Sequence, residues 1–299
     1  MNPTVSKHVL RPSDSINIGF ALFLFCLTLF FREQIPAANT LLLIYASLIV
    51  FQIILVRIGQ WSRALQIIRD IVFPVVAVMV MFDSLGLVVH YVNPQDIDHL
   101  LIRLDYQLFG FHPTVSLEAI MHPLLSDILQ IAYTTYYFLP IAMGVSLWRQ
   151  GNHDAFHFFV FMILLCFYLT YIGYLLFPAL GPRYAMAHLQ TADLPGSIVT
   201  HSIQSALNWL EGVKRDAFPS GHTGIALTAL LLAWRFDQRL FRIFAVPVLL
   251  LVAATVYCRY HYVVDVFGGI ALVVVTWVLG GVYYTFWARR NGYSLPESK

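Results

Sequence analysis

Long apolar runs, separated by short polar segments, extend through the whole chain. A membrane-spanning helix needs about 20 mostly apolar residues, and eight runs reach or approach that length. The sixth run is short and begins with polar residues. We therefore expect an all-α fold, a polytopic bundle of about eight transmembrane helices in a single integral membrane domain over residues 1–299. The expected spans cover residues 15–31, 40–56, 71–89, 126–148, 155–177, 221–234, 241–257 and 264–288.

The composition agrees with this pattern and excludes several classes of protein. Of the 299 residues, 59% are hydrophobic and only 11% are charged, whereas charged residues make up about a quarter of an ordinary soluble domain. The chain has no basic block and no interleaved aromatic patch, so nucleic acid is not an expected partner. Membrane lipids are the expected partners, and no feature of the sequence specifies an oligomeric state.

The distribution of basic residues predicts the orientation of the bundle. Eight spans place both termini on one side, and that side carries twelve of the 18 lysines and arginines. Cytoplasmic loops are enriched in these residues, so we predict that both termini are cytoplasmic. The loop over residues 178–219 and the segment around His261 then face the periplasm or a lumen.

Residues 91–125 are too polar to cross the membrane. They separate the expected accessory spans in residues 1–90 from the expected core in residues 126–299. Pro94 is typical of a first helical turn, and apolar residues then recur at helical spacing up to Gly110. We expect an amphipathic helix on the outer interface, which either admits a lipid head group or packs as a cap over the bundle.

The segment Pro219-Ser220-Gly221-His222 has the pattern of an anion-binding helix start. Proline suits the first turn, where the backbone N–H groups and the helix dipole attract phosphate. Ser220 and Gly221 are therefore candidate phosphate-binding residues, and His222 is a candidate catalytic residue. A proline-serine helix start with a chance histidine is the alternative interpretation.

A second histidine, His261, lies some forty residues later and is followed by Asp265. A spacing of four residues places both side chains on one face of a helix. Asp265 can accept a hydrogen bond from one ring nitrogen, which leaves the other nitrogen of His261 unprotonated and nucleophilic. The alternative is that His261 and Asp265 only hydrogen-bond to each other at a helix end. The predicted topology weakens this alternative, because it places the pair on the same side of the membrane as His222.

Four basic residues are expected on the outer side near these histidines: Arg183, Lys214, Arg215 and Arg259. As a cluster they can neutralise the oxygens of a phosphoryl group, whose transfer depends on positioning and charge stabilisation. Each arginine alone is typical of an interfacial anchor. We take all four as candidate phosphate-binding residues.

Polar residues within the predicted spans are candidates for a substrate pocket. Asp83 lies toward the outer half of the third span, and an ionisable group at membrane depth suggests a function. Four tyrosines nearer the outer ends of their spans can line a pocket with hydroxyl groups: Tyr133, Tyr136, Tyr137 and Tyr171. Interhelical hydrogen bonds and an interfacial aromatic belt are their alternative roles.

Together these motifs resemble those of the type 2 phosphatidic acid phosphatase superfamily. The second motif of that family, Pro-Ser-Gly-His, is intact at residues 219–222, and the third, which ends His-x3-Asp, stands at residues 261–265. The resemblance implies a six-helix core and a mechanism without a metal or another cofactor. It implies that His261 attacks phosphorus to form a phosphohistidine, that Asp265 orients His261 and that His222 protonates the leaving oxygen.

The chain departs from the family pattern in two motifs. In the first motif Leu176 occupies the position of the lysine, while Arg183 can supply the arginine; in the third, Arg259 lies two residues before His261 rather than six. These departures are closer to the inositol phosphorylceramide synthase branch, which moves a phosphorylated head group between lipids. That resemblance also rests on residues 104–110, 181–183 and 260–262.

We therefore expect a membrane enzyme that cleaves a lipid phosphoester, namely a lipid phosphate phosphatase. A transferase that moves a phosphorylated alcohol to a lipid hydroxyl is the alternative. A non-enzymatic transporter is a more remote alternative, because the sequence lacks the repeated or paired broken helices of many transporters.

Overall fold

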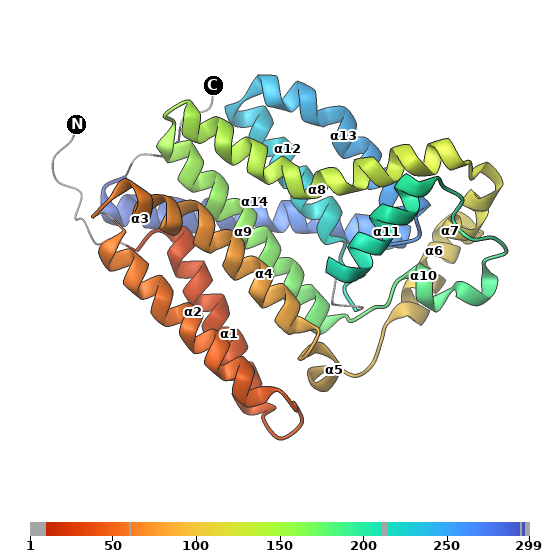
Figure 1. Ribbon diagram of the computed structural model, residues 1–299, viewed down its shortest axis with the longest axis horizontal. Coiled ribbons are helices and arrows are strands. Elements are labelled where there is room, and N and C mark those ends of the chain that lie inside the picture. Colours follow the sequence, from red (N-terminus) through yellow and green to blue (C-terminus); the bar gives the residue numbers. More distant parts are fainter. Residues whose placement is uncertain (1–9, 60, 211–214, 294, 297–299) are drawn as a thin grey trace.

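The computed structural model describes residues 10–59, 61–210, 215–293 and 295–296, and the described chain is helical, as the sequence predicted (Figure 1). The long helices are α1 (Pro12–Phe30), α2 (Ala38–Ile58), α4 (Phe73–Leu85), α8 (Pro123–Arg149), α9 (His153–Leu176), α12 (Gly221–Phe236), α13 (Gln238–Tyr257) and α14 (Val263–Asn291). The shorter helices are α3 (Arg63–Ile67), α5 (Val89–Val92), α6 (Asp98–Phe109), α7 (Pro113–Ser116), α10 (Pro182–Ala185) and α11 (Ile198–Leu210). A π-helical segment, η1 (Ile68–Val72), and two 3-10 segments, η2 (Leu117–Ile120) and η3 (Ala187–Leu189), complete the described elements.

Seven helical segments of the described chain are long and apolar enough to cross a membrane. They correspond to seven of the eight predicted spans, with α3, η1 and α4 forming one continuous segment over Arg63–Leu85. The remaining predicted span is α12, which has only 16 residues. Its length of about 24 Å is less than the roughly 30 Å of a hydrocarbon core. Because α12 contacts α8, α9, α13 and α14, it lies at the centre of the bundle and is enclosed by protein.

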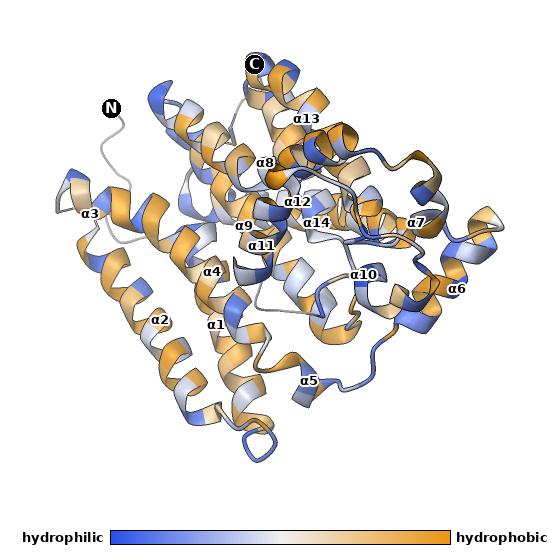
Figure 2. Ribbon diagram, turned by 45° about the vertical axis from the view of Figure 1, so that its right-hand side comes forward, coloured by the Kyte–Doolittle hydropathy of each residue, from blue (hydrophilic) through white to orange (hydrophobic). Residues whose placement is uncertain are grey.

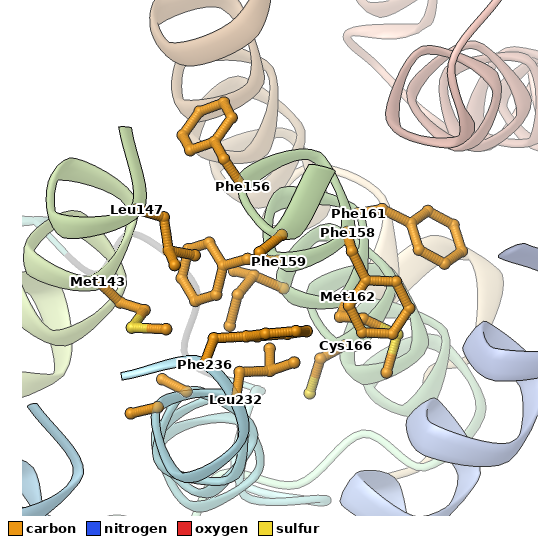
Figure 3. Packing of buried hydrophobic residues seen from close by; sticks show 14 of the residues in the cluster. Met143, Leu147, Phe156, Phe158, Phe159, Phe161, Met162, Cys166, Leu232 and Phe236 are labelled. Carbon is orange, nitrogen blue, oxygen red and sulfur yellow. The ribbon is translucent and has the colours of Figure 1, made fainter. Parts of the chain in front are cut away.

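Large apolar side chains fill the space between α12 and its neighbours (Figure 3). Leu232 and Phe236 of α12 belong to one buried cluster with Phe159 and Met162 of α9 and Met143 of α8. Each of these five side chains is almost fully inaccessible. Since lipid chains are as apolar as these residues, close van der Waals packing stabilises the cluster more than exclusion from water does.

Helices α1 and α4 pack against α9, which also contacts α12. Phe20 of α1 stacks on Tyr168 of α9 with ring centroids 4.4 Å apart. Tyr45 of α2 donates a hydrogen bond to Ser84 of α4 at 2.8 Å. The N-terminal helices, which carry no sequence motif, therefore brace the core.

A buried network of ion pairs joins these helices at one end of the bundle. Arg69 of η1 pairs with Asp14 of α1, and Arg11 pairs with Asp70 of η1. Gln52 of α2 donates to Asp14 Oδ1 at 2.9 Å. Arg69, Asp14 and Asp70 are at most 6% exposed, so the loss of one partner would leave a buried charge uncompensated.

Both ends of the described chain lie at this same end of the bundle. Trp287 Nε1 of α14 donates to Leu10 O at 2.8 Å, and Arg235 donates to Pro296 O at 3.2 Å. Figure 2 shows hydrophobic residues along the long helices and hydrophilic residues gathered in the connecting turns.

Helices α6, α7, α10 and α11 cover the opposite end, away from the termini (Figure 1). Helix α6 is the helix expected within residues 91–125, and it ends at Gly110, whose φ of 76° is left-handed. Helix α11 was not predicted, because residues 178–219 were interpreted as a loop. Asp127 of α8 caps it by accepting hydrogen bonds from Thr200 N at 3.2 Å and Thr200 Oγ1 at 2.6 Å. A cap supplied by a distant helix leaves no local signal in the sequence.

Candidate active site

The start of α12 and the turn between α13 and α14 bring the two candidate histidines together. The ring centroids of His222 and His261 are 5.7 Å apart. Ser220 N donates to Asp265 O at 3.0 Å, which joins the start of α12 to the first turn of α14. The three candidate catalytic residues therefore lie in one cluster at the end of the bundle opposite the termini.

Two glycines allow α12 to begin so close to its neighbours. A Cβ atom at Gly269 of α14 would lie 2.6 Å from Ser220 O, and one at Gly173 of α9 would lie 2.3 Å from Pro219 Cδ. Both distances are below the 3.0 Å at which a neighbour must move. A larger residue at position 269 would therefore displace the helix start that carries His222.

His261 is held with one ring nitrogen against protein acceptors. Its Nδ1 lies 2.7 Å from Ala217 O and 3.4 Å from Asp265 Oδ2. A carbonyl oxygen can only accept, so Nδ1 carries the proton and Nε2 keeps its lone pair. The residue is 3% exposed. Its environment thus fixes both the tautomer and the orientation that a nucleophilic histidine needs.

Asp265 contacts His261, as the sequence predicted, but it also caps the start of α14. Its Oδ2 atom accepts a hydrogen bond from Tyr262 N at 2.8 Å and so caps the start of α14. Its Oδ1 atom is buried and has no hydrogen-bond partner among the described residues. The carboxylate is therefore shared between the helix cap and His261, and the carbonyl of Ala217 is the closer partner of the imidazole.

Tyrosines of α8 enclose His222. The rings of Tyr133 and Tyr136 lie with centroids 4.4 and 4.3 Å from that of His222, and Tyr133 Oη is 3.3 Å from His222 Nδ1. Tyr137 packs edge-on against Tyr136 and is 37% exposed. Since α8 begins at Pro123, Tyr133 lies about 15 Å along the helix from that end. The histidine is therefore recessed below the N-terminal end of α8.

Ser220 and Gly221 form the helix start beside the histidines. Ser220 Oγ accepts a hydrogen bond from Thr223 N at 3.3 Å and is the N-cap of α12. A Cβ atom at Gly221 would lie 2.6 Å from Tyr174 Oη, so the glycine allows that hydroxyl group to approach. The dipole of the 16-residue helix and its first N–H groups favour an anion at this end. Phosphate binding at this helix start stays a prediction.

Arg183 lies beside the turn between α13 and α14, residues 258–262, which carries the candidate nucleophile His261. We call this segment the catalytic turn. Its N–H group donates to Arg259 O at 3.0 Å. The preceding Gly181, with a φ of 86°, approaches the turn so closely that a Cβ would lie 2.8 Å from Tyr260 O. The guanidinium of Arg183 donates to Asn208 Oδ1 of α11 at 2.9 Å. Arg183 thus connects α11 to the turn that carries His261.

Arg259 is held by several protein partners. Its guanidinium pairs with Glu118 at 2.7 Å and donates to Gln190 Oε1 at 3.0 Å and to Ala192 O at 2.8 Å. The side chain is 6% exposed, and its left-handed φ of 63° is unfavourable for a side chain of this size. In this structure Arg259 therefore clamps η2 and the loop after η3 to the catalytic turn, and phosphate binding by Arg259 stays a prediction.

We predict that Arg259→Gln lowers the free energy of unfolding by about 3 kcal/mol, because it leaves the carboxylate of Glu118 in a largely buried site without its partner. Thermal unfolding of the purified protein, followed by its tryptophan fluorescence, measures this change. Arg103→Gln, at an exposed position of α6, is the matched control and should leave unfolding nearly unchanged. Unchanged stability in Arg259→Gln, combined with weaker phosphate binding, would contradict the clamp.

The other two candidate cations do not add to the described cluster. Arg215 pairs with Asp96 at 3.1 Å, in the segment that precedes α6. Lys214 lies outside the described residues. Of the basic candidates that the structure describes, Arg183 is the one whose main chain bonds to the turn before His261 without its own guanidinium being paired to a carboxylate.

Asp83 and Tyr171 have contacts other than those expected of a substrate pocket. Tyr171 is buried, and its hydroxyl donates to Val78 O of α4 at 3.2 Å. Asp83 is exposed on α4, and within the described ranges no hydrogen bond joins it to Arg183 or His222. Tyr171 therefore forms an interhelical hydrogen bond between α9 and α4, which is the alternative to lining a substrate pocket.

Two carboxylates of α6 support the catalytic turn, and the sequence interpretation missed both. Asp105 accepts hydrogen bonds at 3.0 and 2.9 Å from the first two N–H groups of α14. Asp98 accepts from Tyr262 Oη at 2.8 Å and from Gly181 N at 2.9 Å. Both carboxylates lie on the buried face of α6 with Leu101. Acidic residues on an otherwise apolar helix face were therefore the feature of the sequence that could have revealed them. Helix α6 is thus a packing cap over the site.

A third carboxylate, Asp216, precedes the carbonyl that binds His261 and was also missed. The adjacent Ala217 N donates to Ala179 O at 3.1 Å, which fixes this part of the chain beside the end of α9. Burial raises the pKa of Asp216 to about 6, and the nearby His261 opposes that rise. Asp216 therefore adds a titratable group to the surroundings of the proposed nucleophile.

The fold and the cluster define a multi-pass helical membrane protein with a His-His-Asp site at one end of its bundle. The sequence model of the PAP2 superfamily matches residues 99–279, more than half of the chain, and the protein belongs to this superfamily. Its members are generally phosphatases or phosphotransferases, which favours these two activities over transport.

A PA-phosphatase related-family protein of Dictyostelium discoideum is 23% identical to this chain over 186 residues. The aligned part covers 56% of this chain and 34% of that protein, so the chain spans about a third of the length of the relative. No solved structure matches the chain.

Proposed function

We propose that this protein cleaves a phosphoester of a membrane lipid through a phosphohistidine on His261. The observation that carries the proposal is the hydrogen bond from His261 Nδ1 to Ala217 O at 2.7 Å, which leaves the Nε2 lone pair for attack. In the first step Nε2 bonds to phosphorus while the P–O bond to the lipid breaks. The leaving oxygen takes its proton from the imidazolium of His222.

The second step regenerates the enzyme. His222, now neutral, takes a proton from water while the water oxygen bonds to phosphorus and the N–P bond breaks. Inorganic phosphate leaves, His222 is protonated again and His261 is neutral. The start of α12 and Arg183 are the proposed ligands of the phosphoryl oxygens, while Asp265 balances the positive charge on His261.

We place this site on the periplasmic or luminal face and both termini in the cytoplasm, because most basic residues lie in turns at the end that holds the termini. An impermeant maleimide should label a cysteine that replaces exposed His188 in intact cells or sealed vesicles of defined orientation. Labelling only after the membrane is opened would contradict this orientation.

A product assay tests the activity. The purified protein is supplied with phosphatidate or a prenyl phosphate in detergent, with and without a lipid alcohol. Release of inorganic phosphate without an added acceptor supports hydrolysis. Absence of both phosphate release and a labelled phosphoenzyme from all of these substrates and from phospholipid head-group donors would contradict the proposal.

Transfer of a phosphorylated head group to a lipid hydroxyl is the second candidate. It is favoured by the burial of the site, since His261 is 3% exposed and water has limited access to a phosphohistidine there. For this reaction the donor is a phospholipid, and the acceptor is diacylglycerol or ceramide. A product that forms only when the acceptor is present identifies the transferase.

Asp216 gives the proposed reaction a pH dependence. The carboxylate that forms as pH rises through about 6 lies near His261 and stabilises the positive charge that the ring acquires when Nε2 bonds to phosphorus. We therefore expect kcat/KM to rise through about pH 6, and Asp216→Asn to lose this rise. Rate measurements across this pH range, in buffers of constant ionic strength, test the prediction.

The same pKa shift has the opposite effect on stability. Between the ordinary value of 3.8 and about 6, the folded chain keeps a proton that the unfolded chain has released, so the free energy of unfolding falls as pH rises. Asp193→Asn, an exposed change in the same outer region, should retain the wild-type pH dependence of both quantities. An unaltered rate profile in Asp216→Asn would exclude this group from the reaction.

A further inference from the structure

A cavity lies at the end of the bundle opposite the catalytic histidines. It has a volume of about 760 Å³ and is formed where α2 turns into α3 and α8 turns into α9. Figure 1 shows this end, marked by α3, beside the two termini and far from α6 and α11. The volume falls within the range of small-molecule sites, roughly 300–1,000 Å³.

The charge of the cavity is positive. Arg63 of α3, Arg149 at the end of α8 and His153 at the start of α9 all line it, and none of its described lining residues is acidic. Within the described ranges, no protein carboxylate pairs with either arginine. Two guanidinium groups that face one cavity form a site suited to a phosphate group, which arginine recognises through paired hydrogen bonds.

Two tryptophans border the same cavity. The ring of Trp148 packs edge-on against His153 with centroids 5.2 Å apart and against Phe156 at 5.1 Å, which fixes its indole. Trp61 is 73% exposed. Tryptophan is enriched at the boundary between lipid and water, and the cavity lies where four membrane helices begin or end. Its depth is therefore that of the lipid head groups.

We propose that this cavity binds the head group of an anionic phospholipid in the leaflet opposite the catalytic site. The phosphodiester lies between Arg63 and Arg149, and the two indoles border the glycerol and upper acyl region. By the predicted orientation this is the cytoplasmic leaflet, where basic pockets between membrane helices bind anionic head groups. The site is separate from the proposed reaction, and its occupancy does not depend on His261.

Native mass spectrometry of the purified full-length protein tests the proposal. The protein is titrated with phosphatidylglycerol, with neutral phosphatidylcholine, and with soluble glycerol phosphate in separate experiments. We expect phosphatidylglycerol to be retained in preference to phosphatidylcholine. The double substitution Arg63→Gln and Arg149→Gln should weaken its binding by about 25-fold, from roughly fivefold for each cation at the membrane surface.

The control variant loses the same number of positive charges as the test variant, at the same end of the bundle. Arg239→Gln with Arg242→Gln changes two exposed arginines at the start of α13, outside the cavity, and should leave binding unchanged. Arg149→Lys keeps the charge and should retain most of the affinity. Equal weakening in both double variants, or equal retention of the neutral lipid, would overturn the proposal. Glycerol phosphate binding as tight as the lipid would assign the cavity to a soluble phosphate instead.

Discussion

Replacing His261 by alanine should reduce the turnover of a lipid phosphate by about 10⁵-fold, because it removes the atom that is proposed to bond to phosphorus. His261 Nε2 is the ring nitrogen left with a lone pair once Nδ1 donates to Ala217 O at 2.7 Å. Phosphate release at saturating substrate measures the loss. A radiolabelled donor should also leave an acid-labile label on the wild-type protein and none on the variant.

The structure indicates that this variant can be assayed in its folded form. His261→Ala leaves Ala217 O without its donor, which costs about 1–3 kcal/mol for a buried acceptor. His188→Ala, at an exposed position of η3, removes a histidine from the same end of the bundle and should keep both turnover and label. Substantial turnover by folded His261→Ala would rule out the phosphohistidine.

The membrane spans were predictable because the bilayer imposes one strong constraint, the pairing of every backbone polar group within the segment. The apolar run at residues 155–177 accordingly corresponds to α9, which covers His153–Leu176. Helix α12 departs from the usual length because α8, α9, α13 and α14 enclose it. A helix that protein surrounds does not need to match the thickness of the lipid.

The histidines could be found from the sequence because each belongs to a local pattern, a helix start and an i to i+4 pair. The groups that hold them could not, since they depend on contacts between distant segments. Asp105 binds backbone N–H groups of α14 that lie 158 and 159 positions farther along the chain. The acceptor of His261 is the main-chain oxygen of Ala217, which has no side-chain signature at all.

The protein partners of the candidate cations could not be predicted for a related reason. Counting charges on one side of the membrane indicates which residues share that side, but not where their side chains point. Arg259 was grouped with the phosphate ligands, yet it pairs with Glu118, a residue 141 positions away. A polar segment such as residues 91–125 therefore contains side chains that pair with residues of the core. The spacing of apolar residues within that segment does not reveal these pairs.

Replacing His222 by alanine should reduce turnover of alkyl phosphates by about 10²- to 10⁴-fold, the range typical of a lost general acid. The loss in the rate of phosphoenzyme formation should be much smaller for an aryl phosphate such as nitrophenyl phosphate, whose leaving oxygen does not need a proton. With that substrate the phosphoenzyme still forms, but its hydrolysis is slow because no base activates water. We therefore expect a rapid burst of nitrophenol, equal to the amount of enzyme, followed by slow turnover.

Tyr133→Phe separates the chemistry of His222 from its packing. This change keeps the ring that stacks on His222 at 4.4 Å and removes only the hydroxyl that lies 3.3 Å from Nδ1. One such hydrogen bond contributes about 1 kcal/mol, so kcat should fall by roughly five- to tenfold for alkyl phosphates while KM stays constant. If His222→Ala slows phosphoenzyme formation from alkyl and aryl phosphates equally, then His222 positions the substrate and another group supplies the proton. If His222 is a general acid, the rate lost in His222→Ala should depend on the leaving group. If Tyr133 holds the second ring nitrogen of that acid, Tyr133→Phe should lower the rate by a smaller factor than His222→Ala does.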